Sequence, residues 1–354
     1  MTVRPIPADL LPWAMAELPE MSRAEGSLTL VAGDASNRRY FRLQLLNTSY
    51  VVAEAPPATE KNEAFVAVRS ILAAAGVKVP QIHAVDYERG YLLLEDLGDC
   101  SLLPELRSAT VDAYYLQAFD LLGKMTAIDI GSWSGGAYDN ALLSEELGRF
   151  PIWFVEALLA YALNDEERQL IQRFNTALID SALAQPRVLV HRDFHSRNLM
   201  LLPAGELAVI DFQDAVVGPV SYDLVSLLRD CYIRWPADRV QQWALQYFAD
   251  LQKKGMLPNI DESQFLRWVD WMGLQRHIKV LGTFARLYLR DDKPGYLADL
   301  PLVIAYVEEI LQKYAGVEPV FAEFLRWFQL RLSPLIAQQP WAESTPDSEE
   351  CVKS

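Results

Sequence analysis

The fold of this chain is decided by residues 188–224, which read VLVHRDFHSRNLMLLPAGELAVIDFQDAVVGPVSYDL. A short apolar run opens the stretch and leads into a polar segment that holds Asp193 and Asn198. Two more apolar runs follow on either side of a Pro-Ala-Gly turn, which predicts a small β-hairpin ending at Asp211. A strand that feeds a polar loop, followed by a hairpin that ends in a second carboxylate, is expected to bring Asp193, Asn198 and Asp211 together.

These three side chains suit one kind of chemistry. The oxygens of an amide and a carboxylate, here Asn198 and Asp211, are ligands that Mg²⁺ takes together with water and substrate phosphates. A carboxylate that binds no metal, here Asp193, can orient a hydroxyl group and accept its proton. Because phosphoryl transfer is catalysed mainly by positioning and by neutralising charge, the pattern predicts a phosphotransferase that uses Mg²⁺.

The regions on either side of this stretch differ in their pattern of apolar residues. Before residue 98, short apolar runs alternate with turn formers, which predicts a β-rich unit with one helix. Its expected strands cover 28–31, 38–46, 50–54, 81–85 and 91–94, and its expected helix covers 60–75. Beyond residue 98, amphipathic stretches predict helices over 109–128, 144–163, 165–184, 237–254, 262–290, 300–313 and 317–336.

Composition and charge disfavour several classes of protein. The 354 residues carry a formal net charge of −15, which argues against nucleic acid or an anionic membrane surface as a partner. The three cysteines are scattered without a C-x-x-C pair, so a thiolate zinc site is not expected. The N-terminus does not read as a signal peptide, and no charge-free apolar run is long enough to span a membrane. We therefore expect a cytoplasmic monomer that acts on small molecules.

The order and spacing of several motifs resemble a known family. H-x-D-x-x-x-x-N followed by I-D-F is similar to the signature shared by protein kinases and the aminoglycoside and choline kinases. The segments GDASNRRYFR (33–42), LLEDLG (93–98), GPVSYDL (218–224) and QRHIKVLGTFARL (275–287) extend the match. Together they resemble the bacterial anomeric sugar kinases that phosphorylate N-acetylmuramate and N-acetylglucosamine in cell-wall recycling, over residues 25–300.

This resemblance implies an α+β, two-lobed, protein-kinase-like fold. Residues 1–98 would form an N-lobe with a small antiparallel sheet and one helix. Residues 99–340 would form a larger, mostly helical C-lobe, with a hinge near residues 95–99. The polar residues 341–354 would be a disordered acidic tail.

The resemblance also implies roles for individual residues. Asp193 would be the catalytic base that faces the anomeric hydroxyl of the sugar, and Asn198 and Asp211 would hold Mg²⁺ on the ATP phosphates. His191 and Asp223 would be structural residues that orient and brace the catalytic loop. The remaining nucleotide contacts would come from a phosphate loop and from the hinge, namely Gly33, Ser36, Asn37, Glu95 and Leu97.

One departure from the family pattern concerns the lysine that normally reaches the α- and β-phosphates. The strand at 51–54 reads VVAE and contains no lysine. We expect an arginine of the preceding strand, Arg38, Arg39 or Arg42, to supply the positive charge instead. Alternation along a strand places Arg38 and Arg42 on one face, and Glu63 on the following helix would brace the arginine.

The sugar is expected to lie against polar and aromatic residues of the C-lobe. The candidates are His195, Arg229, Asp230, Arg234, Trp235, Arg276 and Lys279. Arg286 and Arg290 continue the basic pattern of the same helix, which is either a solvated face or an electropositive wall for the lactyl carboxylate of N-acetylmuramate.

Two other functions remain open from the sequence. The substrate could be a cationic aminoglycoside or a choline-like amine, which an acidic protein attracts. The missing strand lysine also permits a catalytically silent protein that only binds a nucleotide, although all three of Asp193, Asn198 and Asp211 are present.

Overall fold

The computed structural model describes residues 4–19, 25–32 and 37–342, and the chain divides into two compact units. The first unit comprises Met1–Leu102 together with Asn198–Asp214, and the second comprises Leu103–Arg197 together with Ala215–Ser354. The boundary therefore differs from the one expected at residue 98, because the hairpin after the catalytic loop groups with the first unit.

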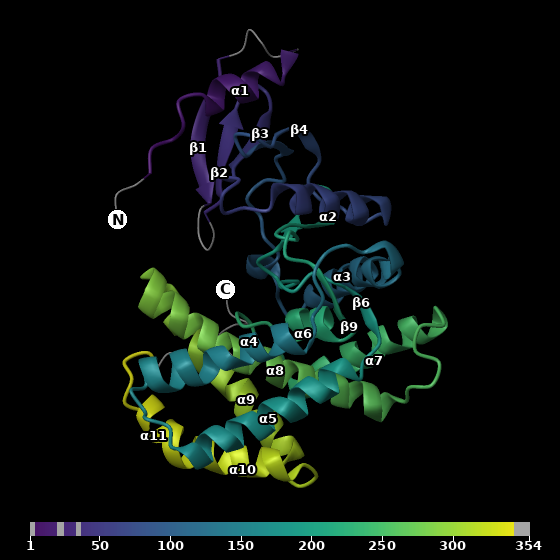
Figure 1. The fold of residues 1–354 in the computed structure, drawn as a ribbon. Helices are drawn as coiled ribbons and strands as arrows, with labels where there is room; N and C mark the ends of the chain where they lie inside the picture. Colours follow the sequence, from purple (N-terminus) through teal and green to yellow (C-terminus); the bar gives the residue numbers. More distant parts are fainter. Residues whose placement is uncertain (1–3, 20–24, 33–36, 343–354) are drawn as a thin grey trace. The chain divides into compact units, whose positions relative to one another are not determined.

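The first unit is built on a five-stranded antiparallel sheet in the order β1-β2-β3-β5-β4. Its strands are β1 (Ser27–Ala32), β2 (Arg39–Gln44), β3 (Ser49–Glu54), β4 (Ile82–Asp86) and β5 (Tyr91–Glu95). Helix α2 (Asn62–Ala74) connects β3 to β4, and the sheet and this helix are drawn in purple and blue in Figure 1. Strands β7 (Leu199–Leu201) and β8 (Leu207–Val209) form the predicted hairpin.

The first unit also contains a helix that the sequence pattern did not predict. Helix α1 (Leu10–Ala16) places Leu10, Trp13 and Ala14 in the core of the sheet. The ring of Trp13 lies 5.5 Å from that of Tyr91. Seven residues with Pro12 among them are too short for a visible helical period, so packing rather than propensity forms this helix.

The second unit is mostly helical, as the sequence predicts. Its α-helices are α3 (Val111–Thr126), α4 (Asn140–Arg149), α5 (Asp165–Leu183), α6 (Tyr222–Leu228), α7 (Ala237–Lys253), α8 (Glu262–Asp291), α9 (Leu300–Tyr314), α10 (Pro319–Trp327) and α11 (Ser333–Ile336). Short 3₁₀ turns η2 (Leu103–Glu105), η3 (Ile130–Ser132) and η5 (Pro294–Asp299) connect some of them. Strands β6 (Arg187–Val190) and β9 (Val216–Pro219) pair antiparallel on either side of the catalytic loop and the hairpin.

Helix α8 organises the second unit. It begins at Asp261, whose side chain accepts a hydrogen bond from the backbone N–H of Gln264 at 2.7 Å. It packs against α4, α5, α6, α7 and α9. At Gly282 it crosses the end of α4 so closely that a Cβ there would meet the backbone of Arg149 and Phe150.

Two stretches predicted as continuous helices contain π-helical turns instead. The expected helix 144–163 is α4 followed by the π-helix η4 (Phe150–Leu158). The expected helix 317–336 is α10, the π-helix η6 (Phe328–Leu332) and α11. Pro151 and Pro334 lie at these places, and a proline cannot donate the backbone hydrogen bond of a regular helix.

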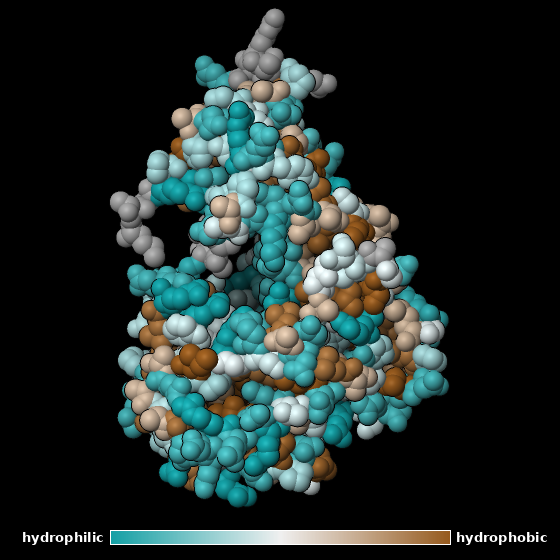
Figure 2. Space-filling model, in the orientation of Figure 1, coloured by the Kyte–Doolittle hydropathy of each residue, from teal (hydrophilic) through white to brown (hydrophobic). Residues whose placement is uncertain are grey.

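The C-terminal end departs from the expectation of a disordered tail beginning at residue 341. Trp341 is buried, and its ring lies 6.5 Å from that of Phe154. Residues 343–354 lie outside the described part of the chain. Among the described helices none is long and apolar enough to cross a membrane, and the face drawn in Figure 2 is mainly hydrophilic with scattered apolar residues.

Candidate active site

The catalytic loop follows β6 in the second unit and is fixed by Asp223 in the first turn of α6. The carboxylate of Asp223 accepts hydrogen bonds from the backbone N–H of His191 at 2.6 Å and of Arg192 at 3.0 Å. The backbone of Arg192 is left-handed, with φ at +78°, a conformation that a non-glycine residue adopts only when its surroundings hold it. The backbone N–H of Asp193 in turn donates to Nδ1 of His191 at 3.2 Å. Asp223 and His191 therefore hold the backbone of the loop from His191 to Asp193.

A second carboxylate, Asp230, holds the far end of the same loop. Asp230 is fully buried and accepts hydrogen bonds from the backbone N–H of Ser196 at 2.9 Å and from its hydroxyl at 2.5 Å. It also accepts one from the backbone N–H of Tyr232 at 3.2 Å. Asp230 is thus a loop brace, and the structure does not place it as the sugar contact that the sequence suggested.

The charge of Asp193 is set by its neighbours in the second unit. Burial by itself would raise the pKa of Asp193, but Lys279, His195 and Arg276 lower it to about 2. The carboxylate is therefore ionised at neutral pH. Burial lowers the pKa of His195 below its usual value.

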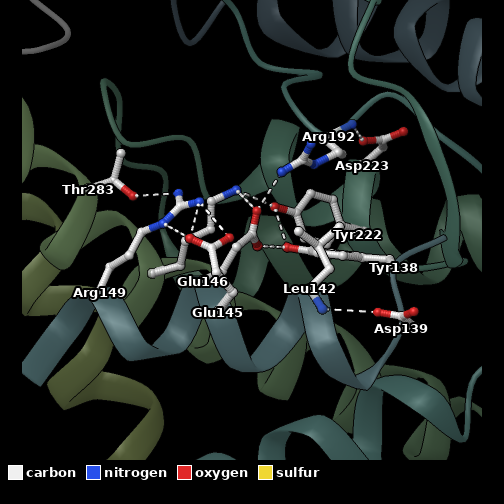
Figure 3. A network of polar contacts seen from close by, with 11 residues as sticks. Tyr138, Asp139, Leu142, Glu145, Glu146, Arg149, Arg192, Tyr222, Asp223 and Thr283 are labelled. Carbon is white, nitrogen blue, oxygen red and sulfur yellow. Dashed lines mark hydrogen bonds and ion pairs between the residues drawn. The ribbon is translucent and has the colours of Figure 1, made fainter. Parts of the chain in front are cut away.

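The cations around Asp193 are themselves held by a buried glutamate that the sequence did not reveal. Glu146 of α4 is fully buried and accepts a hydrogen bond from the Arg192 guanidinium at 2.6 Å. It lies 3.3 Å from Nζ of Lys279, which donates to the Tyr222 hydroxyl at 3.0 Å. Tyr138 donates its hydroxyl proton to the same carboxylate (Figure 3). Burial raises the pKa of Glu146, but Lys279 and Arg192 outweigh it and keep the pKa below its usual value.

The proposed metal ligands belong to the first unit, at the base of the β7–β8 hairpin. The Nδ2 of Asn198 lies 3.4 Å from Oδ2 of Asp211, and Gln213 donates to Oδ1 of Asp211 at 2.7 Å. Asp211 is exposed and left-handed, with φ at +64°. An exposed carboxylate beside an amide whose oxygen can turn toward a cation is a donor set that fits Mg²⁺. No cluster of three or more His, Cys, Asp or Glu side chains suited to a metal occurs among the residues described.

Arg38 is braced by different residues from those expected. Its guanidinium donates to Oδ1 of Asn62 at 3.3 Å and lies 3.7 Å from the carboxylate of Glu60. Glu63, the expected brace, is exposed, so Glu60 takes that role one helical turn earlier. Burial raises the pKa of Tyr40, and the charges that act on this phenol include both Arg38 and Asp211.

Arg42 and Arg39 both form ion pairs with carboxylates. Arg42 binds Asp96 at 2.6 Å and Asp99 at 2.8 Å, and these contacts raise the pKa of its guanidinium. Arg39 binds Glu54 at 2.5 Å. Of the three arginines expected to replace the lysine, Arg38 is the one that stacks on Phe65, whose ring lies 4.9 Å from that of Phe212, the residue after Asp211.

The expected hinge residues are placed within the first unit. Leu97 is buried in an apolar cluster with Met200 and Ala208 of the hairpin. The carboxylate of Glu95 forms an ion pair with Lys78, at 2.8 Å. Asn37 donates its backbone N–H to Glu60 at 3.1 Å, while Gly33 and Ser36 lie outside the described residues.

Three of the expected sugar contacts have structural partners instead. Arg229 is buried and binds Asp270 at 2.7 Å. Trp235 is buried and donates its indole N–H to the Tyr115 hydroxyl at 3.0 Å. Arg234 binds Glu309 at 2.8 Å. Of the seven candidates, His195, Arg276 and Lys279 are those that surround Asp193.

An ionised aspartate on a doubly braced loop, an antiparallel sheet unit and a helical unit together define a protein-kinase-like phosphotransferase. The chain belongs to the phosphotransferase enzyme family, which it matches over residues 27–265. A Pseudomonas putida protein named N-acetylmuramate/N-acetylglucosamine kinase is 44% identical over 298 residues, covering 84% of this chain and 86% of that protein. A Neisseria meningitidis protein of the same name is 37% identical over 314 residues, covering 88% and 92%. The chain is a small-molecule kinase.

Solved structures agree with this fold. The choline kinase of Streptococcus pneumoniae superposes with a TM-score of 0.57 at 16% identity, covering 86% of this chain and 99% of that one. Its complex with AMP gives a TM-score of 0.56 at 16% identity, covering 82% and 96%. An ethanolamine kinase of Plasmodium vivax gives 0.61 at 11% identity, covering 91% and 93%. At these identities the likeness establishes the protein-kinase-like fold.

Proposed function

We propose that this chain transfers the γ-phosphoryl group of ATP to the anomeric (C1) hydroxyl of N-acetylmuramate and N-acetylglucosamine, and so serves cell-wall recycling in the cytoplasm. The observation that carries the proposal is Asp193, an ionised carboxylate on a loop braced by Asp223 and Asp230. The names of the relatives supply the substrate, and the sequences match over most of both chains.

Asp193 has the properties that a sugar kinase needs at the accepting hydroxyl. Because its pKa is held at about 2, it accepts a hydrogen bond from the hydroxyl at any physiological pH and orients the oxygen toward phosphorus. As the oxygen–phosphorus bond forms, the hydroxyl proton passes to this carboxylate, and ADP leaves with the electrons of the broken bond.

The first unit carries the residues that we assign to the nucleotide. Asn198 and Asp211 would hold Mg²⁺, which neutralises phosphate charge when bound. Arg38 supplies the positive charge that the strand lysine provides elsewhere in this fold, since Arg38 and Asp211 both act on the Tyr40 phenol while Arg42 is tied to Asp96 and Asp99. The apolar cluster at Leu97 suits the flat face of adenine.

The surroundings of Asp193 disfavour a cationic substrate. Lys279, Arg276 and Arg192 all act on the Asp193 carboxylate, and all lower its pKa. An amine bound beside these cations would be repelled, whereas a neutral or acidic sugar would not. The charge distribution therefore supports an amino sugar over an aminoglycoside or choline.

The test is ATP consumption with each of N-acetylmuramate, N-acetylglucosamine, kanamycin and choline. We expect turnover with the two sugars and a drop in kcat of about 10²- to 10⁴-fold in Asp193→Asn, with little change in melting temperature. Turnover with kanamycin or choline but with neither sugar would overturn the proposal. Sugar turnover that survives in Asp193→Asn would remove Asp193 from its role.

A further inference from the structure

Helix α8 carries a row of cationic side chains that begins beside the catalytic carboxylate. At about 3.6 residues per turn, Arg276, Lys279, Thr283, Arg286 and Arg290 fall within about 80° of the helix circumference. The first two act on Asp193 and lower its pKa. The row therefore runs from the reacting hydroxyl toward the C-terminal end of α8, entirely within the second unit.

Two of the four cations in this row have a carboxylate of their own, as does Arg149 of the neighbouring α4. Lys279 lies 3.3 Å from Glu146. Arg149 of α4 binds Glu145 at 3.0 Å and also donates to the Thr283 hydroxyl at 3.4 Å (Figure 3). Arg290 binds Asp291 at 2.8 Å. These pairs leave little positive charge for a ligand.

Arg286 differs from its neighbours. It is partly buried, and it makes no hydrogen bond or ion pair with any residue that the structure describes. Its Nε is buried and lacks a hydrogen-bond partner. Burial, followed by the charges of Arg149 and Arg290, lowers the pKa of the Arg286 guanidinium, against smaller opposing effects of Asp291 and Glu145. A half-buried guanidinium between two other cations is stabilised by an anion, and a carboxylate fits its planar fork of N–H donors.

The position of Arg286 suits the far side of a bound sugar. It lies seven residues beyond Lys279 on α8, which is about 10 Å along the helix axis. In N-acetylmuramate the lactyl ether is attached to C3, two ring atoms from C1, so the C1 hydroxyl and the lactyl carboxylate are separate groups that two different side chains can contact.

We propose that Arg286, with the Thr283 hydroxyl beside it, binds the lactyl carboxylate of an acidic amino sugar and so favours N-acetylmuramate over N-acetylglucosamine. This inference rests on the proposed function, because it concerns the same substrate site. The neighbouring Lys279 and Arg290 are paired with carboxylates of their own, and Arg286 itself makes the contact that separates the two sugars.

The test is the ratio of kcat/KM for N-acetylmuramate to that for N-acetylglucosamine. In Arg286→Gln we expect this ratio to fall about 10- to 100-fold, the usual loss for a hydrogen bond between charged groups. Arg286→Lys keeps the charge but loses the fork geometry, so its ratio should lie between those of the wild type and Arg286→Gln. The matched control is Arg267→Gln near the start of α8, where the arginine is half exposed and lies 3.8 Å from Glu318. Its ratio should equal that of the wild type.

The methyl ester of N-acetylmuramate adds a chemical control. With the wild-type enzyme, replacing the acid by its methyl ester should lower kcat/KM about as much as the Arg286→Gln substitution lowers it for the acid. With the ester as substrate, Arg286→Gln and the wild type should have the same kcat/KM. An unchanged ratio, or an equal loss with both sugars, would overturn the assignment of Arg286 while leaving the proposed function intact. Absence of wild-type turnover with either sugar would overturn both.

Discussion

Asp193 is kept ionised by cations, and those cations are anchored by a second carboxylate. Arg192 and Lys279 both contact Glu146, which is fully buried between them. Taking one member from such a buried network leaves uncompensated charge, so Glu146 links the stability of the second unit to the geometry at Asp193. Glu145 and Glu146 are neighbours in the sequence, yet only Glu146 is buried.

We expect Glu146→Gln to destabilise the protein by about 3–5 kcal/mol, because Arg192 and Lys279 would stay buried without their counter-ion. The matched control is Glu145→Gln on the same helix, where the carboxylate is 58% exposed and pairs with Arg149. That substitution should change stability by about 1 kcal/mol or less. Urea unfolding measures both variants, and equal effects would contradict the role of Glu146.

Lys279→Met should raise the pKa of Asp193, since Lys279 is the first of the charges that lower it. In the wild type the protonation of Asp193 affects kcat/KM only near pH 2, below the working range. In Lys279→Met the acid limb of kcat/KM should move up by about 1–3 pH units, the usual effect of losing a nearby opposite charge. The measurement is the pH profile of kcat/KM, with Lys253→Met, whose side chain is 75% exposed, as control. An acid limb that stays in place would show that Lys279 does not control the charge of Asp193.

The residues that sequence reasoning could find are those that lie close together in the chain. Asp193, Asn198 and Asp211 follow one another around a single loop and hairpin, and their spacing is readable. Glu146 reaches Arg192 across 46 residues, and nothing in the pattern of α4 distinguishes it from Glu145. The residue types of Arg229 and Trp235 suit sugar contacts, but whether such a side chain is buried depends on tertiary packing.

A strong periodicity of apolar side chains predicts the position of a helix well, and a weak periodicity does not. Helix α8 was expected at 262–290 and is found at Glu262–Asp291, with Asp261 as its N-cap. Helix α1 was missed because its seven residues show no repeat. The π-helical turns were missed because side-chain periodicity does not show which backbone hydrogen bonds a proline removes.

Gly282 and Gly148 offer a paired prediction about helix packing. A Cβ at Gly282 would meet the backbone of Arg149 and Phe150, whereas a Cβ at Gly148 has nothing within 4 Å. We expect Gly282→Ala to destabilise by about 1–3 kcal/mol through overpacking. Gly148→Ala should stabilise by about 0.5–1 kcal/mol, because alanine restricts the unfolded chain and favours a helix. Chemical denaturation measures the change in the free energy of unfolding of each variant. A change in the same direction for both variants would contradict the close crossing of α8.

The residues that we assign to the proposed reaction come from both units. Asp193 and the α8 row belong to the second unit, whereas Arg38, Asn198 and Asp211 belong to the first. The chain enters the first unit a second time through Asn198–Asp214. Sequence position alone could not predict this second entry into the first unit, because the pattern of apolar residues in the hairpin resembles neither neighbouring region. Only the contacts of the hairpin assign it to a unit.

The metal ligands can be tested through the stability of the whole chain. A ligand that binds only the folded protein raises the free energy of unfolding, by about 2.7 kcal/mol at 100 times its dissociation constant. ATP with Mg²⁺ should therefore raise the melting temperature of the wild type more than ATP with EDTA does. In Asp211→Asn the part of this shift that depends on Mg²⁺ should be lost, because the exposed carboxylate beside Asn198 is gone. Asp214→Asn, three residues further on and also exposed, should behave as the wild type. If Asp211→Asn retains the full Mg²⁺-dependent shift, the cation is held by other residues.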